Sequence, residues 1–201
     1  MKQILAIIVA FVALAVSAQT PQQVLDKAVA AMKGAGTSSA NYTVRTKQGS
    51  MSGTIVISGS KFRILSKDVK TWYDGKIQWS YSTATGEVNI TKPTADELAM
   101  TNPLAAAQAF KNKFNMWKSA GQIAGSYAIM LMPKGKSDIK KLYLYITNGT
   151  NLLNKAYFVM NDGSTMTISI SNYKTKQSLP ASTFTYDAKQ VPAGTQVVDL
   201  R

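Results

Sequence analysis

The hydrophobic positions of this chain follow two periodicities. Over residues 21–33 they recur at intervals of three and four, which predicts one amphipathic helix. Thr20, Pro21 and Gln23 form a capped start for that helix. Most of the remaining chain alternates hydrophobic and polar residues in short runs between turn residues such as Asp74–Gly75 and Asp162–Gly163, which is typical of antiparallel strands. We count about eleven strands.

The middle of the chain breaks the strand pattern. From Pro93 to about Trp117 the spacing is helical again, and Thr94 with Glu97 gives a second capping box. Asn102–Pro103 divides this insertion into two short helices. Strands resume after Gly125, and a last short strand is predicted around Phe184 and Tyr186. The pattern predicts one mainly β domain with helices, of the α+β class, over residues 19–201.

The helical pieces admit two interpretations. They either fill the apolar face of the sheet as an ordinary core, or they cover it as a lid above a cavity for an apolar ligand. Periodicity alone does not choose between these two arrangements.

The first eighteen residues have the form of an export signal. Lys2 precedes an apolar run over residues 4–16, which is shorter than the roughly 20 residues of a membrane-spanning helix. Val16-Ser17-Ala18 fits a signal-peptidase site, so we predict cleavage before Gln19 and a mature protein in the periplasm.

The amino-acid composition excludes several kinds of catalytic and metal-binding site. The 201 residues include no cysteine and no histidine, which excludes thiol nucleophiles, thiolate metal sites, disulfides and imidazole bases. Two Ser-x-x-Lys matches lack the partner motifs and the helical setting of a serine acyl-enzyme. We therefore predict a binding protein without catalytic residues, metal or cofactor.

The formal net charge of +13 is the second compositional signal. Lysines cluster in two groups, Lys111, Lys113 and Lys118, and Lys134, Lys136, Lys140 and Lys141. Such a surface is either a solvated face or a docking surface for anionic partners. No nucleic-acid-binding motif accompanies it, so we predict no nucleic-acid partner.

The order of elements resembles that of the LolA family of periplasmic lipoprotein carriers. The resemblance rests on a collinear series along the mature chain: residues 41–47 and 53–57 as the first two strands, residues 74–81 (DGKIQWSY) as the family's hairpin, Asn102-Pro103-Leu104 in the lid region, and residues 184–199 as the ending. One departure is that the stretch Ile57-Ser58-Gly59-Ser60-Lys61 lacks the family's lid-latching arginine, and Lys61 and Arg63 are only nearby.

The resemblance implies an unclosed antiparallel half β-barrel whose concave apolar face is covered by helices. It also implies a monomeric carrier that takes acylated lipoproteins from an inner-membrane ABC transporter to an outer-membrane receptor. The residues expected to line the cavity are Ile55, Ile57, Phe62, Ile64, Ile77, Trp79, Tyr81, Val88 and Ile90, and those expected in the lid are Leu98, Met100, Leu104 and Phe110.

One other function remains open at this point, and the sequence disfavours a further one, an outer-membrane barrel. The same half-barrel could bind a lipid or glycolipid, or act as an envelope-stress sensor, without transporting lipoproteins. An outer-membrane barrel would show apolar outward faces, whereas the alternate positions here carry Thr, Ser, Lys and Gln.

Overall fold

A computed structural model describes residues 19–121 and 123–201 of the chain; the side chain of Met100 and the predicted signal peptide lie outside the described part. The helices are α1 (Pro21–Gly34), α2 (Ala95–Thr101) and α3 (Pro103–Lys113), with two short 3-10 helices, η1 (Ala181–Phe184) and η2 (Ala188–Gln190). The strands are β1 (Ser38–Thr46), β2 (Gly49–Ser58), β3 (Lys61–Ser66), β4 (Val69–Tyr73), β5 (Gln78–Ser82), β6 (Glu87–Thr91), β7 (Phe114–Lys118), β8 (Ser126–Pro133), β9 (Ile139–Thr147), β10 (Leu153–Met160), β11 (Thr165–Lys174) and β12 (Gln196–Asp199).

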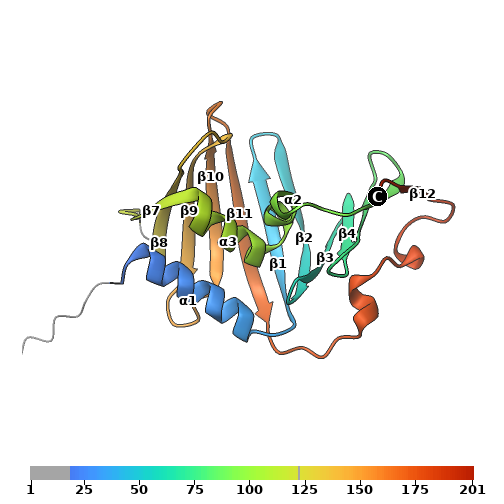
Figure 1. Cartoon of the computed structure of the whole chain (residues 1–201), viewed down its shortest axis with the longest axis horizontal. Coiled ribbons are helices and arrows are strands. Elements are labelled where there is room, and N and C mark those ends of the chain that lie inside the picture. The colour runs from blue at the N-terminus through green and yellow to red at the C-terminus, as the bar shows by residue number, and fades with distance from the viewer. Residues whose placement is uncertain (1–18, 122) are drawn as a thin grey trace, which may run out of the picture.

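All of these strands belong to one unclosed sheet. Their order is β12-β6-β5-β4-β3-β2-β1-β11-β10-β9-β8-β7, so β12 and β7 form the two edges (Figure 1). Neighbouring strands are antiparallel except β12, which runs parallel to β6. The predicted mainly β fold with an open half-barrel and helices is confirmed.

The helices begin at the residues that the sequence marks. Thr20 and Thr94 each accept a hydrogen bond from the backbone three residues on, and Gln23 and Glu97 each accept one from the backbone of the cap residue. The bonds between Glu97 and Thr94 lower the pKa of the Glu97 carboxyl. Local sequence alone therefore fixes where α1 and α2 start.

A first core lies between the helices and one half of the sheet. Val24, Leu25 and Ala28 of α1 and Ala107 of α3 are buried against β7 to β10. Their partners include Ile129, Leu131, Leu142, Leu144, Ile146 and Ala156, and Ile168 of β11 packs beside them. We call the side of the sheet that carries these residues the helix face, and the other side the outer face.

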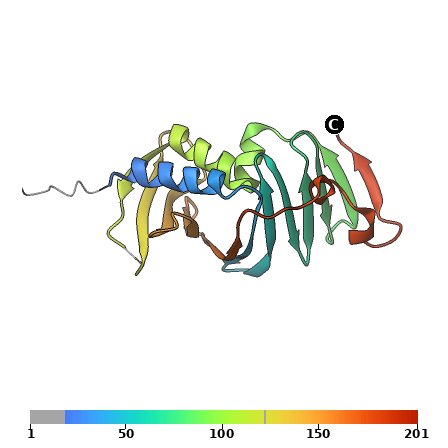
Figure 2. The same cartoon turned by 90° about the horizontal axis from the view of Figure 1, so that it is seen from below.

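A second core lies on the outer face of the other half. Trp72, Tyr81 and Val88 are buried together, with Leu65 and Trp79 beside them. Residues 175–195, here called the C-terminal segment, run past this half of the sheet towards β12 (Figure 2). Tyr186 and Val191 of this segment pack onto the second core, and the Tyr186 ring meets Trp72 edge to face at 5.6 Å.

Three details of the predicted elements are wrong. The helical spacing to Trp117 ends in a strand, because residues 114–118 pair with β8 as an edge strand. Phe184 ends a 3-10 helix instead of lying in a strand, and the last strand is β12. Asp74–Gly75 is the pattern of a two-residue hairpin turn, but the structure has a four-residue connection there, in which the Asp74 carboxylate accepts hydrogen bonds from the amides of Lys76 and Ile77.

Candidate functional site

An apolar strip continues the helix face beyond the first core. Directly paired residues of neighbouring strands point to the same side of a sheet. Val44 of β1 pairs with Ile168 of the first core and therefore lies on the helix face. The pairings of β1 with β2, β2 with β3 and β3 with β4 then identify the residues of these strands that lie on the same face. The strip comprises Tyr42, Ile55, Ile57, Phe62, Ile64 and Tyr73.

The strip is only partly covered. Phe62 and Tyr73 are buried and stack at 5.2 Å between ring centroids, whereas Ile55, Ile57 and Ile64 remain half-buried. Burial raises the pKa of the Tyr42 hydroxyl, and burial followed by the charge of Asp74 raises the pKa of Tyr73. Both phenols therefore stay uncharged at neutral pH, and the strip presents a neutral surface.

Gly53 makes room for Tyr42 on this strip. The two residues pair across β1 and β2, and a Cβ at position 53 would lie 2.2 Å from the carbonyl oxygen of Leu65 and 2.8 Å from the Tyr42 hydroxyl. Only glycine fits under the Tyr42 ring without moving a strand.

The nine residues expected to line one cavity do not share one face of the sheet. Ile55, Ile57, Phe62 and Ile64 are on the helix face, as the register above requires. Trp79 and Tyr81 fall on the outer face, because Trp79 pairs with Trp72, and Trp72 pairs with Arg63. Val88 and Ile90 pair with Tyr81 and Trp79 and share that face, and Ile77 lies in the β4–β5 turn.

This division has a simple physical cause. Trp79, Tyr81 and Val88 pack against the C-terminal segment in the second core, which removes them from any surface under the helices. On the helix face, β4, β5 and β6 carry the polar side chains of Thr71, Ser80 and Asn89. The apolar side of the sheet thus changes from the helix face to the outer face at β4, which carries Tyr73 on the helix face and Trp72 on the outer face.

The expected lid residues also occupy different environments. Phe110 packs into the first core and meets Phe114 edge to face at 5.4 Å. Leu98 and Leu104 are half-buried and lie outside both cores. The Met100 prediction falls on a side chain outside the described part.

Asn102 joins α2 and α3 to the sheet. These two helices carry the expected lid residues and are called the lid helices here. Its side-chain oxygen accepts hydrogen bonds from the amides of Leu104 and Ala105 and so caps α3. Its side-chain Nδ2 donates to the carbonyl oxygen of Ser60, in the turn between β2 and β3, at 3.0 Å. Asn102 is 4% exposed, so both interactions are shielded from water.

The two basic residues nearest to the position of the family's arginine lie away from α2 and α3. Lys61 and Arg63 both project from the outer face, because they pair with Ser58 and Val56 of β2. Neither can reach helices on the other side of the sheet. The sequence marks Asn102 as a helix break, but its bond to Ser60, 42 residues away, has no sequence signal.

Ion pairs tie the ends of the lid helices to their neighbours. Lys111 of α3 pairs with Asp26 of α1 at 2.5 Å, and Lys113 pairs with Asp96 of α2 at 2.6 Å. Partly or fully exposed pairs of this kind contribute about 0–1 kcal/mol each.

In the described part of the chain, no helix is long and apolar enough to cross a membrane.

The fold and this strip define the class of the protein: an open-sheet β protein with helices over an apolar face. The chain belongs to the family described as "Outer membrane lipoprotein carrier protein LolA", which matches residues 11–151. The resemblance drawn from the sequence is confirmed. No curated protein sequence matches the chain.

Several solved structures are similar to this one at low sequence identity. An uncharacterized conserved protein from Thermus thermophilus is 14% identical, with 89% of this chain and 98% of that chain covered and a TM-score of 0.62. The Pseudomonas aeruginosa MucA/MucB complex gives 11% identity and a TM-score of 0.51, with 86% of this chain and 63% of that chain covered. A LolA superfamily protein from Nitrosomonas europaea is 14% identical, with 84% of this chain and 99% of that chain covered and a TM-score of 0.45.

Proposed function

We propose that this protein is a periplasmic carrier that binds the acyl chains of lipoproteins between the apolar strip and the lid helices. The observation that carries the proposal is the half-buried strip of Ile55, Ile57 and Ile64 on the helix face of a LolA-family fold. The proposed partners are acylated lipoproteins, an inner-membrane ABC transporter and an outer-membrane receptor. We propose that the protein acts by binding and not by catalysis.

The energetics of the lid fit a carrier that must open. Each methylene group that an acyl chain buries gains roughly 0.8 kcal/mol, so one chain of ordinary length gains on the order of 10 kcal/mol. Against this, the polar contacts of α2 are the Asn102–Ser60 hydrogen bond, worth about 0.5–1.5 kcal/mol, and the exposed Lys113–Asp96 pair. These polar contacts are therefore weak compared with the free energy that a bound acyl chain gains.

The direct test mixes the purified protein with spheroplasts and measures lipoproteins released in complex with it. Ile55→Glu places a charge on the strip and is expected to abolish release, because a carboxylate cannot share a surface with an acyl chain. Thr54→Glu is the matched control: it lies one position along β2, on the exposed outer face, and should release lipoproteins like the unmodified protein.

Both variants need a folding check by circular dichroism and urea unfolding. Full release by a folded Ile55→Glu protein would exclude the strip as the acyl site. Failure of the unmodified protein to release any lipoprotein would refute the carrier function itself.

A second candidate keeps the fold but drops transport. The alternative from the sequence is a lipid-binding or stress-sensing protein of the cell envelope, and the similarity to MucB, which was solved in complex with MucA, supports it with a protein of the same fold that binds another protein. Such a protein would bind a fluorescent fatty acid in the same strip and still leave lipoproteins on the spheroplasts. The combination of these two assays separates the candidates.

A further inference from the structure

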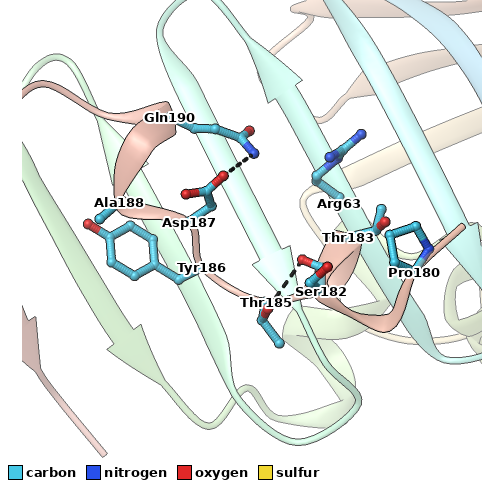
Figure 3. A pocket seen from close by; sticks show the side chains of 9 residues that line it. All are labelled: Arg63, Pro180, Ser182, Thr183, Thr185, Tyr186, Asp187, Ala188 and Gln190. Atoms are coloured by element: carbon cyan, nitrogen blue, oxygen red, sulfur yellow. Dashed lines mark hydrogen bonds between the residues drawn. The ribbon is translucent and has the colours of Figure 1, made fainter.

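A hollow of about 460 Å³ lies on the outer face, away from the strip. Arg63 of β3 forms one wall, and the C-terminal segment forms the rest, including Ser182, Thr183, Asp187 and Gln190 (Figure 3). Its walls therefore come from two parts of the chain that are far apart in the sequence. The second core, through the contact of Trp72 with Tyr186, holds the segment in place.

Arg63 carries a positive charge that forms no ion pair with the residues that the structure describes. Its Nε atom is buried and has no hydrogen-bond partner, and within residues 19–121 and 123–201 no carboxylate forms an ion pair with it. Partial burial lowers the pKa of the guanidinium, because it reduces the contact of this charge with water. A bound anion would compensate for this reduced contact.

The surroundings of Arg63 contain further donors. Trp72 pairs directly with Arg63 across β3 and β4, and its indole Nε1 has no partner among the described residues, but Trp72 is fully buried and does not line the hollow. The hydroxyl groups of Ser182 and Thr183 line the hollow. Lys70, on the same face, donates to the backbone carbonyl of Gln190, so a second cation lies next to the segment.

Asp187 is the acidic residue of the hollow, and its carboxylate is already engaged. One oxygen accepts a hydrogen bond from the Lys189 amide and the other from the Gln190 side chain, both at 3.0 Å. These bonds, with that of Gln190 foremost, lower the pKa of Asp187. The carboxylate serves the turn of η2 instead of neutralising Arg63 (Figure 3).

We propose that this hollow binds a phosphate ester, with Arg63 as the residue that contacts the phosphate. A guanidinium fork holds two phosphate oxygens, and hydroxyl groups can donate to the others, which suits a tetrahedral anion with several acceptors. The volume leaves space for the group esterified to the phosphate. The ester is either a soluble metabolite or the headgroup of an anionic lipid.

This site is independent of the proposed carrier function, because the hollow and the apolar strip lie on opposite faces of the sheet. Loss of one would leave the other intact. Release of lipoproteins from spheroplasts therefore serves as a separate readout for every variant below.

The test is a titration of the ¹⁵N-labelled full-length protein followed by NMR. The probes are glycerol 1-phosphate and phosphatidylcholine vesicles with and without phosphatidic acid. We expect one probe to move the Arg63 Nε–H and Trp72 Nε1–H signals in a saturable way. A response to glycerol phosphate identifies a soluble ester, and a response only to phosphatidic acid vesicles identifies a lipid headgroup.

Variants assign the effect to the hollow. Arg63→Gln is expected to weaken binding by at least about tenfold, because it removes the charge-assisted hydrogen bonds. Arg45→Gln is the matched control, since Arg45 is exposed on the same outer face but outside the hollow. Asp187→Asn keeps the oxygen that bonds to the Lys189 amide and removes a negative charge, so it should tighten binding.

Two results would overturn the proposal. The first is the absence of a saturable shift with either probe in the unmodified protein. The second is an equal loss of binding in Arg45→Gln and Arg63→Gln, which would indicate attraction to the basic surface as a whole. If Arg63→Gln does not fold, Asp187→Asn decides, and unchanged or weaker binding there counts against the site.

Discussion

Asn102 performs two tasks that one substitution can separate. Its oxygen caps α3, and its Nδ2 donates to Ser60 in the β2–β3 turn. Asn102→Ser keeps a capping oxygen, since serine and asparagine cap helices equally well, but it removes the donor that reaches Ser60. Asn102→Ala removes both.

The magnitudes follow from these contacts. Loss of the bond to Ser60 should lower the free energy of detaching the lid helices by about 0.5–1.5 kcal/mol. At about 1.4 kcal/mol per tenfold, local opening becomes roughly 2- to 12-fold more frequent. Asn102→Ala should cost about 1 kcal/mol more, because α3 also loses its cap.

Amide hydrogen exchange measures the opening residue by residue. The amides of Leu98 and of position 102 bond within α2 and should exchange faster in Asn102→Ser than in the unmodified protein. Thr20→Ala is the control, because it removes a cap from α1 without touching the β2–β3 turn. Unchanged exchange of α2 in Asn102→Ser would refute the role of this bond as a latch.

Three further predictions concern the two cores and the sheet. Gly53→Ala should lower the free energy of unfolding in urea by about 1–3 kcal/mol or more, because the new Cβ collides with the Leu65 carbonyl oxygen. Gly135→Ala is the control and should have little effect, because there is open space around Gly135. Trp72→Ala should lower the free energy of unfolding by about 3–5 kcal/mol and make the C-terminal segment sensitive to protease. If the segment stays as resistant as in the unmodified protein, the second core does not hold the segment in place. Burial raises the pKa of Tyr173 to about 12 in the folded state, so folding favours the neutral phenol. The free energy of unfolding should therefore fall as the pH rises from about 10 to 12. The Tyr173→Phe variant should lose less stability over this range.

Local patterns along the chain determined much of the fold. Capping boxes at Thr20 and Thr94 and the break at Asn102–Pro103 set the helix starts, because these signals act within four residues. Alternation of apolar and polar residues located most strands. The collinear motifs indicated the LolA family, which the match over residues 11–151 confirms.

The edges of elements were harder to predict. The spacing of Phe110, Phe114 and Trp117 fits a helix, but the backbone of residues 114–118 pairs with β8 instead. A helix and an edge strand can both present such spacing over a few residues. The hydrogen bonds offered by a neighbouring strand made the choice.

Only the tertiary structure decided which apolar residues meet. Within each strand, alternation separates two faces, but it does not say which face of one strand continues into the next. Ile55 and Trp79 alternate in the same way with their polar neighbours, yet the register places them on opposite sides. Each face is then covered by a different distant segment, the helices on one side and residues 175–195 on the other. The sequence determined the hydrophobic periodicity and the helix caps, because these depend on interactions between residues close together in the chain. The apolar strip, the Asn102–Ser60 hydrogen bond and the Arg63 hollow depend on contacts between segments far apart in the chain, so only the tertiary structure decided them.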